Sequence, residues 1–260
     1  MCSSGVMTPF TAASHKLWLM LLRSALLKVP HGFTTRKGGV SEGPFESLNL
    51  SASTGDAADN VAENQRRVLA EFANPPVAAL HQVHGNEVHV VSGPGVWKGD
   101  GLLTQTKGLL LRVSVADCYP VLLHDAEKGV VGALHAGWRG VVAGILPKAL
   151  GMMRERFGSR MKDVRLAVGQ GISGAVFQVG PEVVEAMQGA GLSAFRTDPK
   201  FAGRFLADLE ACLRTQALRE GVLSEHYWAM GACTYQDRRF FSHRRDQGKT
   251  GRMWAVIKAD

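Results

Sequence analysis

The sequence has few cysteines and no cysteine pairs. Its 260 residues include four cysteines, at positions 2, 118, 212 and 233, and no Cys-x-x-Cys motif. This scatter excludes a disulfide framework and a cysteine-rich zinc finger, and it favours a reducing, cytoplasmic setting. The greasy run 17–22 is far shorter than the ~20 apolar residues of a membrane span, and Arg23 ends it. We therefore expect no membrane partner.

Repeats, low-complexity tracts and long linkers are also missing. The chain is long enough to bury a large core, so one domain is the default. We expect residues 1–28 to form an irregular leader and residues 29–260 to form a single catalytic domain. Oligomeric state is not encoded visibly, and a monomer or a small homo-oligomer is expected.

The formal charge of +7 permits either nucleic-acid binding or an enzyme with phosphate-bearing substrates. Basic residues gather only near the C-terminus, between Arg238 and Arg252. No recognisable nucleic-acid module surrounds them, so we expect no nucleic-acid partner.

Strand-like and helix-like segments alternate along the chain, which predicts an α/β or α+β fold. Helices are predicted after Asp59 as N-cap, over 142–157, from Pro181 and near 209–217; strands are predicted over 77–84, 87–91, 109–115, 130–135, 164–168, 177–179, 227–230, 240–244 and 253–258. Gly85 and Asn86 read as the turn of a hairpin between 77–84 and 87–91. Pro120 reads as a loop residue, because proline cannot donate to a central ladder.

Three predicted strand ends carry His84, Cys118 and His135. Strand ends that open into loops are where α/β folds usually place their sites. Two imidazoles and a thiolate are good zinc ligands, and three of them leave a fourth tetrahedral position open for catalysis. From spacing alone, a buried thiol beside hydrogen-bonded loop histidines is an equally good interpretation.

Two phosphate-loop motifs and a copper cluster can be set aside. The GxGxxG match at 169–174 is followed by another strand-like run and not by a helix, and the GKT at 248–250 has His243 where a phosphate loop needs glycine. No His-x-His pair of the multicopper type occurs among the nine histidines. Copper is therefore less expected than zinc.

Several motifs together resemble the YfiH-like family, whose members are also named laccase-domain or polyphenol oxidase family proteins, purine nucleoside phosphorylases and peptidoglycan editing factors. The matching segments are TRKGGVS (35–41), SLNL (47–50), HQVHG (81–85), ADCYPVLL (116–123), HAGWRG (135–140) and RRDQGKTGRM (244–253). The resemblance runs from about His31 to Ile257.

The resemblance implies zinc held by His84, Cys118 and His135, and a single α/β domain of mixed sheets flanked by helices, distantly similar to the catalytic domain of cytotoxic necrotizing factors. It implies phosphorolysis of adenosine, inosine, guanosine and methylthioadenosine, and deamination of adenosine. It also raises Arg36, Asn49 and Arg244 to candidate substrate-binding residues. The two arginines suit phosphate through bidentate contacts.

The chain departs from its relatives at 51–56, where many have a histidine, and at 169–172, where they often have GPCI; both departures bear on substrate preference. Three other functions compete with the nucleoside enzyme, and the first is a copper polyphenol oxidase, which the lack of a His-x-His pair makes less expected. Cys118 could be a nucleophile with His135 as its base, in a hydrolase or amidase that edits cell-wall precursors. The protein could instead be a binding module in which zinc only stabilises the fold, although structural zinc usually has four protein ligands.

Overall fold

The structure, a computed structural model, describes residues 20–260, and in this part of the chain most strands belong to two six-stranded sheets. The first sheet has the order β1 (Leu21–Leu22), β2 (His31–Thr34), β15 (Met253–Lys258), β7 (Leu110–Val115), β3 (Val77–His81), β5 (Gly95–Lys98). The second has the order β14 (Tyr227–Ala229), β10 (Val164–Val168), β8 (Tyr119–Asp125), β9 (Val130–Ala136), β6 (Gly101–Thr104), β4 (Val88–Val90). Each sheet mixes parallel and antiparallel pairs.

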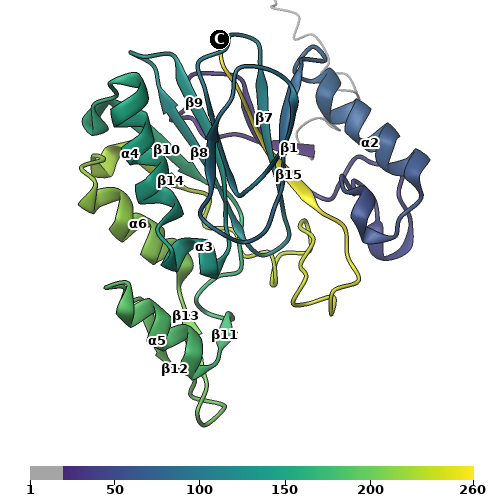
Figure 1. Ribbon diagram of the computed structural model, residues 1–260. Helices are drawn as coiled ribbons and strands as arrows, with labels where there is room; N and C mark the ends of the chain where they lie inside the picture. The colour runs from purple at the N-terminus through teal and green to yellow at the C-terminus, as the bar shows by residue number, and fades with distance from the viewer. Residues whose placement is uncertain (1–19) are drawn as a thin grey trace, which may run out of the picture.

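Helices cover the outer faces of both sheets (Figure 1). The α-helices of the described residues are α2 (Ala58–Ala70), α3 (Trp138–Val142), α4 (Ile145–Phe157), α5 (Pro181–Gly189) and α6 (Leu209–Arg219), and all but α5 lie on these faces. In Figure 1, α2 lies beside the first sheet, and α3, α4 and α6 lie beside the second. A small sheet of β11 (Gln178–Val179), β13 (Phe205–Ala207) and β12 (Phe195–Thr197) packs with α5 at one end of the molecule. The expected α/β fold with mixed sheets and flanking helices is confirmed.

Strand alternation divides the core into layers. Leu122 of β8 faces the first sheet, whereas its neighbours Val121 and Leu123 face the helices of the outer layer. The same alternation on β7 places Leu111 between the sheets and Leu110 under α2. Strands β8 and β9 are buried along their whole length because both of their faces are covered.

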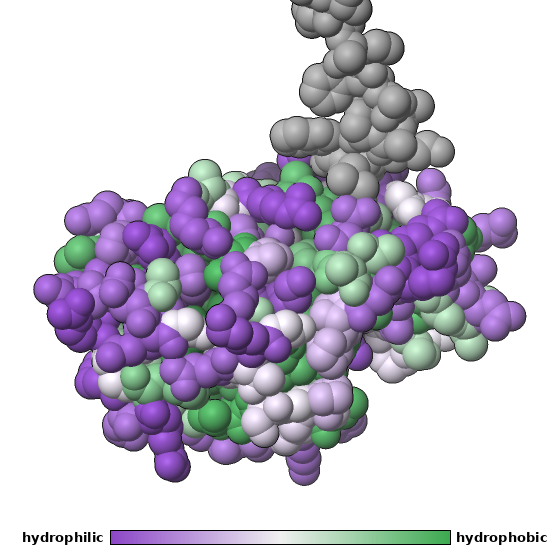
Figure 2. All heavy atoms as spheres, turned by 90° about the horizontal axis from the view of Figure 1, so that it is seen from above, coloured by the Kyte–Doolittle hydropathy of each residue, from purple (hydrophilic) through white to green (hydrophobic). Residues whose placement is uncertain are grey.

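Part of the expected leader belongs to this fold. Residues 1–19, Cys2 among them, lie outside the described residues. In the remaining part, 20–28, β1 pairs with β2, and Met20, Leu21 and Leu27 are buried. In the described part of the chain no helix is long and apolar enough to cross a membrane. Figure 2 shows one face, on which hydrophilic residues predominate and apolar residues are interspersed.

The predicted hairpin over 77–91 is wrong. Strand β3 pairs in parallel with β5 and β7 in the first sheet, whereas β4 pairs in parallel with β6 in the second. The segment between them does not close on itself, because the Asp100 carboxylate accepts hydrogen bonds from the backbone N–H groups of Val83, His84 and Gly85. The chain therefore crosses between the sheets at His84.

Three further local predictions need correction. Pro120 lies in β8, near its start, where the missing N–H does little harm to the ladder. Residues 240–244 form a bend that leads into turns and not a strand, and the Ser242 carbonyl accepts a hydrogen bond from the backbone N–H of Asp246, as in a turn. The N-cap of α2 is Ala57; Asp59 lies in the first turn, where its charge favours the helix N-terminus.

Candidate metal centre

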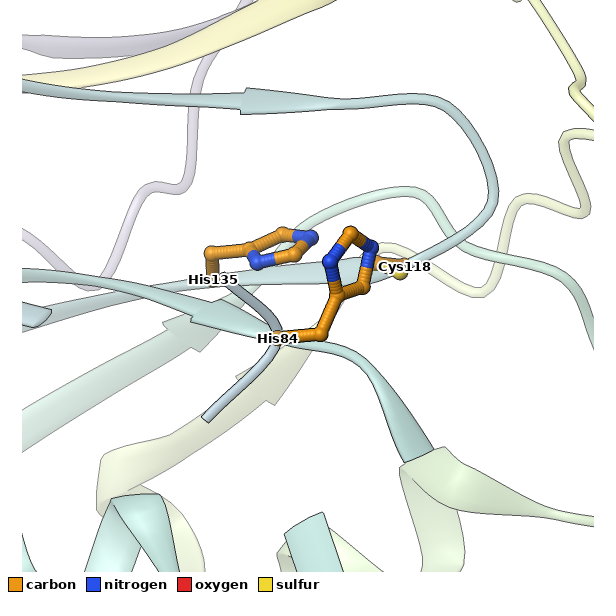
Figure 3. Close-up of side chains that lie close together, drawn as sticks. All are labelled: His84, Cys118 and His135. Atoms are coloured by element: carbon orange, nitrogen blue, oxygen red, sulfur yellow. The ribbon is translucent and has the colours of Figure 1, made fainter. Parts of the chain in front are cut away.

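His84, Cys118 and His135 converge at the junction of the two sheets (Figure 3). His84 lies in the crossover after β3, Cys118 ends the three-residue connection from β7 to β8, and His135 is near the end of β9. Their ligand atoms all lie within 4.8 Å of one another. The two imidazole rings meet edge to face, with centroids 4.8 Å apart. The sequence-predicted trio is thus brought together by segments far apart in the chain.

Two of the residues that shape this cluster have left-handed backbone conformations. His84 has φ 62° and Asp117, next to Cys118, has φ 88°. Non-glycine residues adopt such angles only where surrounding contacts enforce them. At Asp117 the carboxylate accepts hydrogen bonds from the Thr234 hydroxyl (2.6 Å) and the Arg244 backbone N–H (2.7 Å). Two of the five non-glycine residues with positive φ in the described part of the chain thus lie at this cluster.

Asp100 is the residue that sequence reasoning missed. It is fully buried and accepts hydrogen bonds from the His135 ring at Nδ1 (2.8 Å) and from the backbone N–H groups of His84 (3.0 Å) and Gly85 (2.7 Å). Burial alone raises the pKa of Asp100, but the bonds from His135 and Gly85 outweigh it and lower that pKa. The carboxylate turns Nε2 of His135 toward Cys118 and His84, as carboxylates behind metal-binding histidines do. An isolated aspartate in a loop gives no sequence signal for this role.

The three donors suit zinc by their chemistry. Burial raises the pKa of the Cys118 thiol, but the charge of His135 and hydrogen bonds with His135 and His84 lower it to about 6. Burial lowers the pKa of His135, and the Cys118 thiolate and Asp100 raise it to about 9. A thiolate with two imidazoles is a common zinc set, whose tetrahedral geometry places donors roughly 3.3–3.7 Å apart. The observed spacing needs a contraction of at most about 1.5 Å to reach it.

Gly137 leaves the space that the cluster occupies. A Cβ built there meets Cys118 Sγ at 3.1 Å, His84 Cδ2 at 3.3 Å and His135 Cε1 at 3.9 Å. A larger residue at position 137 would therefore press on Cys118 and His84 and would contact His135. This explains the glycine in the segment 135–140 and agrees with a closely packed ligand set.

The cluster opens into a cavity of about 690 Å³, a size typical of small-molecule sites. Its charged wall residues are mainly arginines: Arg112, Arg139, Arg244 and Arg252. One acidic residue, Asp117, lines it, and its carboxylate is already bound to Thr234 and Arg244. Trp138 and Phe177 provide aromatic surface. The cavity is thus suited to an anion together with a flat, partly apolar group.

The predicted substrate residues fall in different places. Arg244 lines the cavity, with its guanidinium donating to the Gln178 carbonyl (2.9 Å). Arg36 does not line it; its guanidinium lies 4.6 Å from the centre of the Phe241 ring. Asn49 is fully buried outside the wall and accepts a hydrogen bond from the backbone N–H of Arg252 (2.9 Å), so it positions a residue that does line the cavity.

Several other histidine, cysteine and glycine residues of the chain lie outside the metal cluster. His81 is exposed on β3 and lines the cavity, without belonging to the metal cluster. Cys212 and Cys233 are buried free thiols. Gly169 and Gly171 do not form a tight turn: they follow β10, and Gly171 forms an isolated bridge with Cys233. A Cβ at these two positions would collide with Phe33 and Tyr119, so the glycines serve packing. In the part of the chain that the structure describes, one group of three or more potential metal ligands is found.

Comparison with known proteins places this site in a family. The family described as "Multi-copper polyphenol oxidoreductase laccase" matches residues 30–260. The chain is 45% identical over 241 residues to a purine nucleoside phosphorylase of Deinococcus radiodurans, covering 92% of each chain. It is 36% identical to the purine nucleoside phosphorylase YfiH of Escherichia coli, covering 86% of this chain and 91% of the relative.

Solved structures agree with the sequence relatives. The crystal structure of YlmD from Geobacillus stearothermophilus superposes with a TM-score of 0.87 at 33% identity, covering 92% of this chain and 96% of that one. YfiH from Bacillus licheniformis gives a TM-score of 0.84 at 32% identity, covering 90% and 93%. By sequence and by fold, the chain belongs to the laccase-domain family of YfiH and YlmD.

Proposed function

We propose that this protein is a zinc-dependent purine nucleoside phosphorylase that acts on adenosine, inosine, guanosine and methylthioadenosine, and that it also deaminates adenosine. The observation that carries the proposal is the position of the His84, Cys118 and His135 cluster in the wall of a cavity whose other charged groups are mainly arginines. The names of relatives up to 45% identical support the phosphorylase reaction.

The metal supplies one part of this chemistry. His84, Cys118 and His135 would hold zinc and leave one tetrahedral position for an exogenous group. When bound there, zinc supplies a Lewis acid that polarises an electron-rich group of the substrate or a water molecule. Asp100 keeps the Nδ1 side of His135 occupied, so that Nε2 remains available to the metal.

The chain's own residues bind and orient the substrates. In phosphorolysis a phosphate oxygen forms a bond to the ribose C1′ while the bond from C1′ to the purine nitrogen breaks, and the purine takes up a proton. Arg244 is placed to hold the phosphate, because its guanidinium faces the cavity and its backbone is tied to Asp117 beside Cys118. Trp138 and Phe177 offer apolar faces for the purine. Asn49 contributes by accepting a hydrogen bond from the backbone N–H of Arg252, and Arg36 contributes by packing over the Phe241 ring.

Product analysis tests the proposal. Purified protein of known metal content is incubated with adenosine, with and without phosphate. Phosphorolysis yields adenine and ribose 1-phosphate only when phosphate is present, whereas deamination yields inosine and ammonia in either case. Samples stripped by a chelator and reloaded with zinc or copper identify the metal. Full turnover by metal-free protein, or a requirement for several copper ions, contradicts the proposal.

One observation favours a second function, a cysteine hydrolase. Asp100, His135 and Cys118 lie in a line of hydrogen-bonding partners, and the low pKa of the Cys118 thiol beside the raised pKa of His135 describes a thiolate–imidazolium pair. Such a pair needs no second imidazole at His84. His84→Ala therefore separates the hydrolase, which keeps much of its activity, from the zinc enzyme, which loses its metal and its activity.

A further inference from the structure

The cavity extends beyond the metal cluster onto the face of the first sheet that α2 covers. On β7, Arg112 stands opposite Val256 of β15, and Ser114 stands opposite Trp254. Val256 and Trp254 belong to the core layer under α2, so Arg112 and Ser114 point to the same side. Both line the cavity, as does Ser51. This end of the cavity is called the α2 arm below, and its residues are Ser51, Gln65, Arg112, Ser114 and Arg252.

Arg112 differs from the paired arginines in its surroundings. In residues 20–260, it forms no ion pair, and its one hydrogen bond, from Nη1 to the Ser114 hydroxyl, is long at 3.5 Å. By contrast, carboxylates pair with six other arginines: Arg66, Arg67, Arg154, Arg160, Arg239 and Arg245. The Arg112 guanidinium lies 4.5 Å from the centre of the Trp254 ring. Most of its five N–H donors therefore lack an acceptor.

Burial makes this arrangement costly. It lowers the pKa of Arg112 to about 10, so the side chain remains a cation at neutral pH. A partly buried cation without a counter-ion destabilises a fold unless a ligand supplies the missing charge. The neighbouring Trp254 Nε1 is also a buried donor without an acceptor within the described part of the chain. The α2 arm thus has an excess of donors and positive charge.

We propose that the α2 arm is a phosphoryl-binding subsite, in which Arg112 and Arg252 contact the anion and the hydroxyls of Ser51 and Ser114 complete its hydrogen bonds. A guanidinium that packs over an indole ring is restrained by it and keeps N–H groups available for an anion, which suits phosphate oxygens. The phosphoryl group comes either from the phosphate of a nucleotide or from free inorganic phosphate. In the second case Arg112 and Arg252 hold the phosphate of phosphorolysis in place of Arg244, whose guanidinium is bonded to the Gln178 carbonyl. The inference rests on the proposed function only in taking this cavity as the substrate site.

The test measures binding to the zinc-loaded full chain by titration calorimetry, with inorganic phosphate, adenosine 5′-monophosphate and adenosine as probes. Arg112→Met removes the charge and keeps an unbranched apolar stem on Trp254, and Arg112→Lys restores the charge without the planar fork. Arg196→Met, at an exposed position on β12 outside the cavity, is the matched control.

We expect Arg112→Met to weaken binding of phosphate or of the monophosphate by about 10–100-fold while adenosine binds as before. Arg112→Lys should recover part of the loss, and Arg196→Met should lose nothing. A loss for both anions or for phosphate alone assigns the subsite to free phosphate, and a loss for the monophosphate alone assigns it to a nucleotide. Without any anion, Arg112→Met should melt about 2–4 °C higher than the parent, because the substitution removes the cost of burying an unpaired cation.

Unchanged binding of both anions in Arg112→Met overturns the proposal, and so does a lower melting temperature that Arg112→Lys restores, since that pattern describes a structural arginine. These outcomes are independent of turnover. If the parent protein cleaves adenosine and Arg112→Met binds both anions as well as the parent does, the proposed function stands and the subsite is refuted. If Arg112→Met loses anion binding but the parent protein cleaves no nucleoside, the subsite stands and the proposed function is refuted.

Discussion

Asp100→Asn is the substitution that examines the metal centre most directly. The carboxylate serves two pairs of donors: Oδ1 accepts from the His135 ring and the His84 N–H, and Oδ2 accepts from the N–H groups of Gly85 (2.7 Å) and Val83 (3.3 Å). Asparagine has the same shape but only one accepting oxygen. Whichever way its amide is turned, its NH₂ group faces one of the two donor pairs.

The expected loss follows from this geometry. At least two of the four hydrogen bonds and the negative charge behind His135 disappear, so two proposed ligands, His84 and His135, lose part of their orientation. Partners of this kind behind metal ligands are worth about 10–100-fold in metal affinity, or about 1.4–2.8 kcal/mol. We expect Asp100→Asn to bind zinc more weakly by that factor.

Competition with a fluorescent zinc chelator measures the affinity, and circular dichroism checks the fold. Glu87→Gln is the control, because Glu87 lies close in sequence to His84 but is exposed and pairs only with Lys148 at the surface, where ion pairs contribute about 0–1 kcal/mol. Wild-type zinc affinity in a folded Asp100→Asn protein would refute the reasoning that Asp100 orients the ligands.

Three other outcomes are expected. His84→Ala, Cys118→Ala and His135→Ala should each lose bound zinc, measured by elemental analysis, together with nucleoside turnover, since two ligands bind zinc poorly. Arg244→Met should raise the Michaelis constant for phosphate about tenfold, with a smaller change in that for the nucleoside. Equal changes in both constants would show that Arg244 does not bind the phosphate. Iodoacetamide should label Cys118 rapidly in metal-free protein and slowly after zinc is added, while the buried Cys212 stays unlabelled in both.

The convergence of His84, Cys118 and His135 could be predicted because each lies near a segment with a clear strand pattern and within a motif that resembles the YfiH-like family. Asp100 could not, because its partners are 15 to 35 residues away and nothing near Asp100 signals them. Arg112 was equally hidden, since a polar residue inside an apolar strand normally reads as a solvent-facing position. Both roles arise only when the two sheets meet.

The wrong hairpin has the same origin. Gly85 and Asn86 are good turn residues, and local propensity favours a return of the chain at that point. The buried carboxylate of Asp100 binds three successive backbone N–H groups there, and the Asn86 side chain donates to the Ala143 carbonyl in the connection between α3 and α4. These long-range hydrogen bonds outweigh the local preference for a turn, so the chain continues into the second sheet.

Cys118 connects the two competing functions, because its sulfur cannot be both a metal ligand and a free nucleophile. The line from Asp100 through His135 to Cys118 suits either role. His84 is the residue that separates them. Its left-handed backbone is held by Asp100, and its ring meets the His135 ring at 4.8 Å between centroids. A thiol hydrolase needs one imidazole beside its sulfur, and His84 only adds to the lowering of the Cys118 pKa that His135 already causes. A zinc site needs a third ligand at this position, so the geometry of His84 favours the metal.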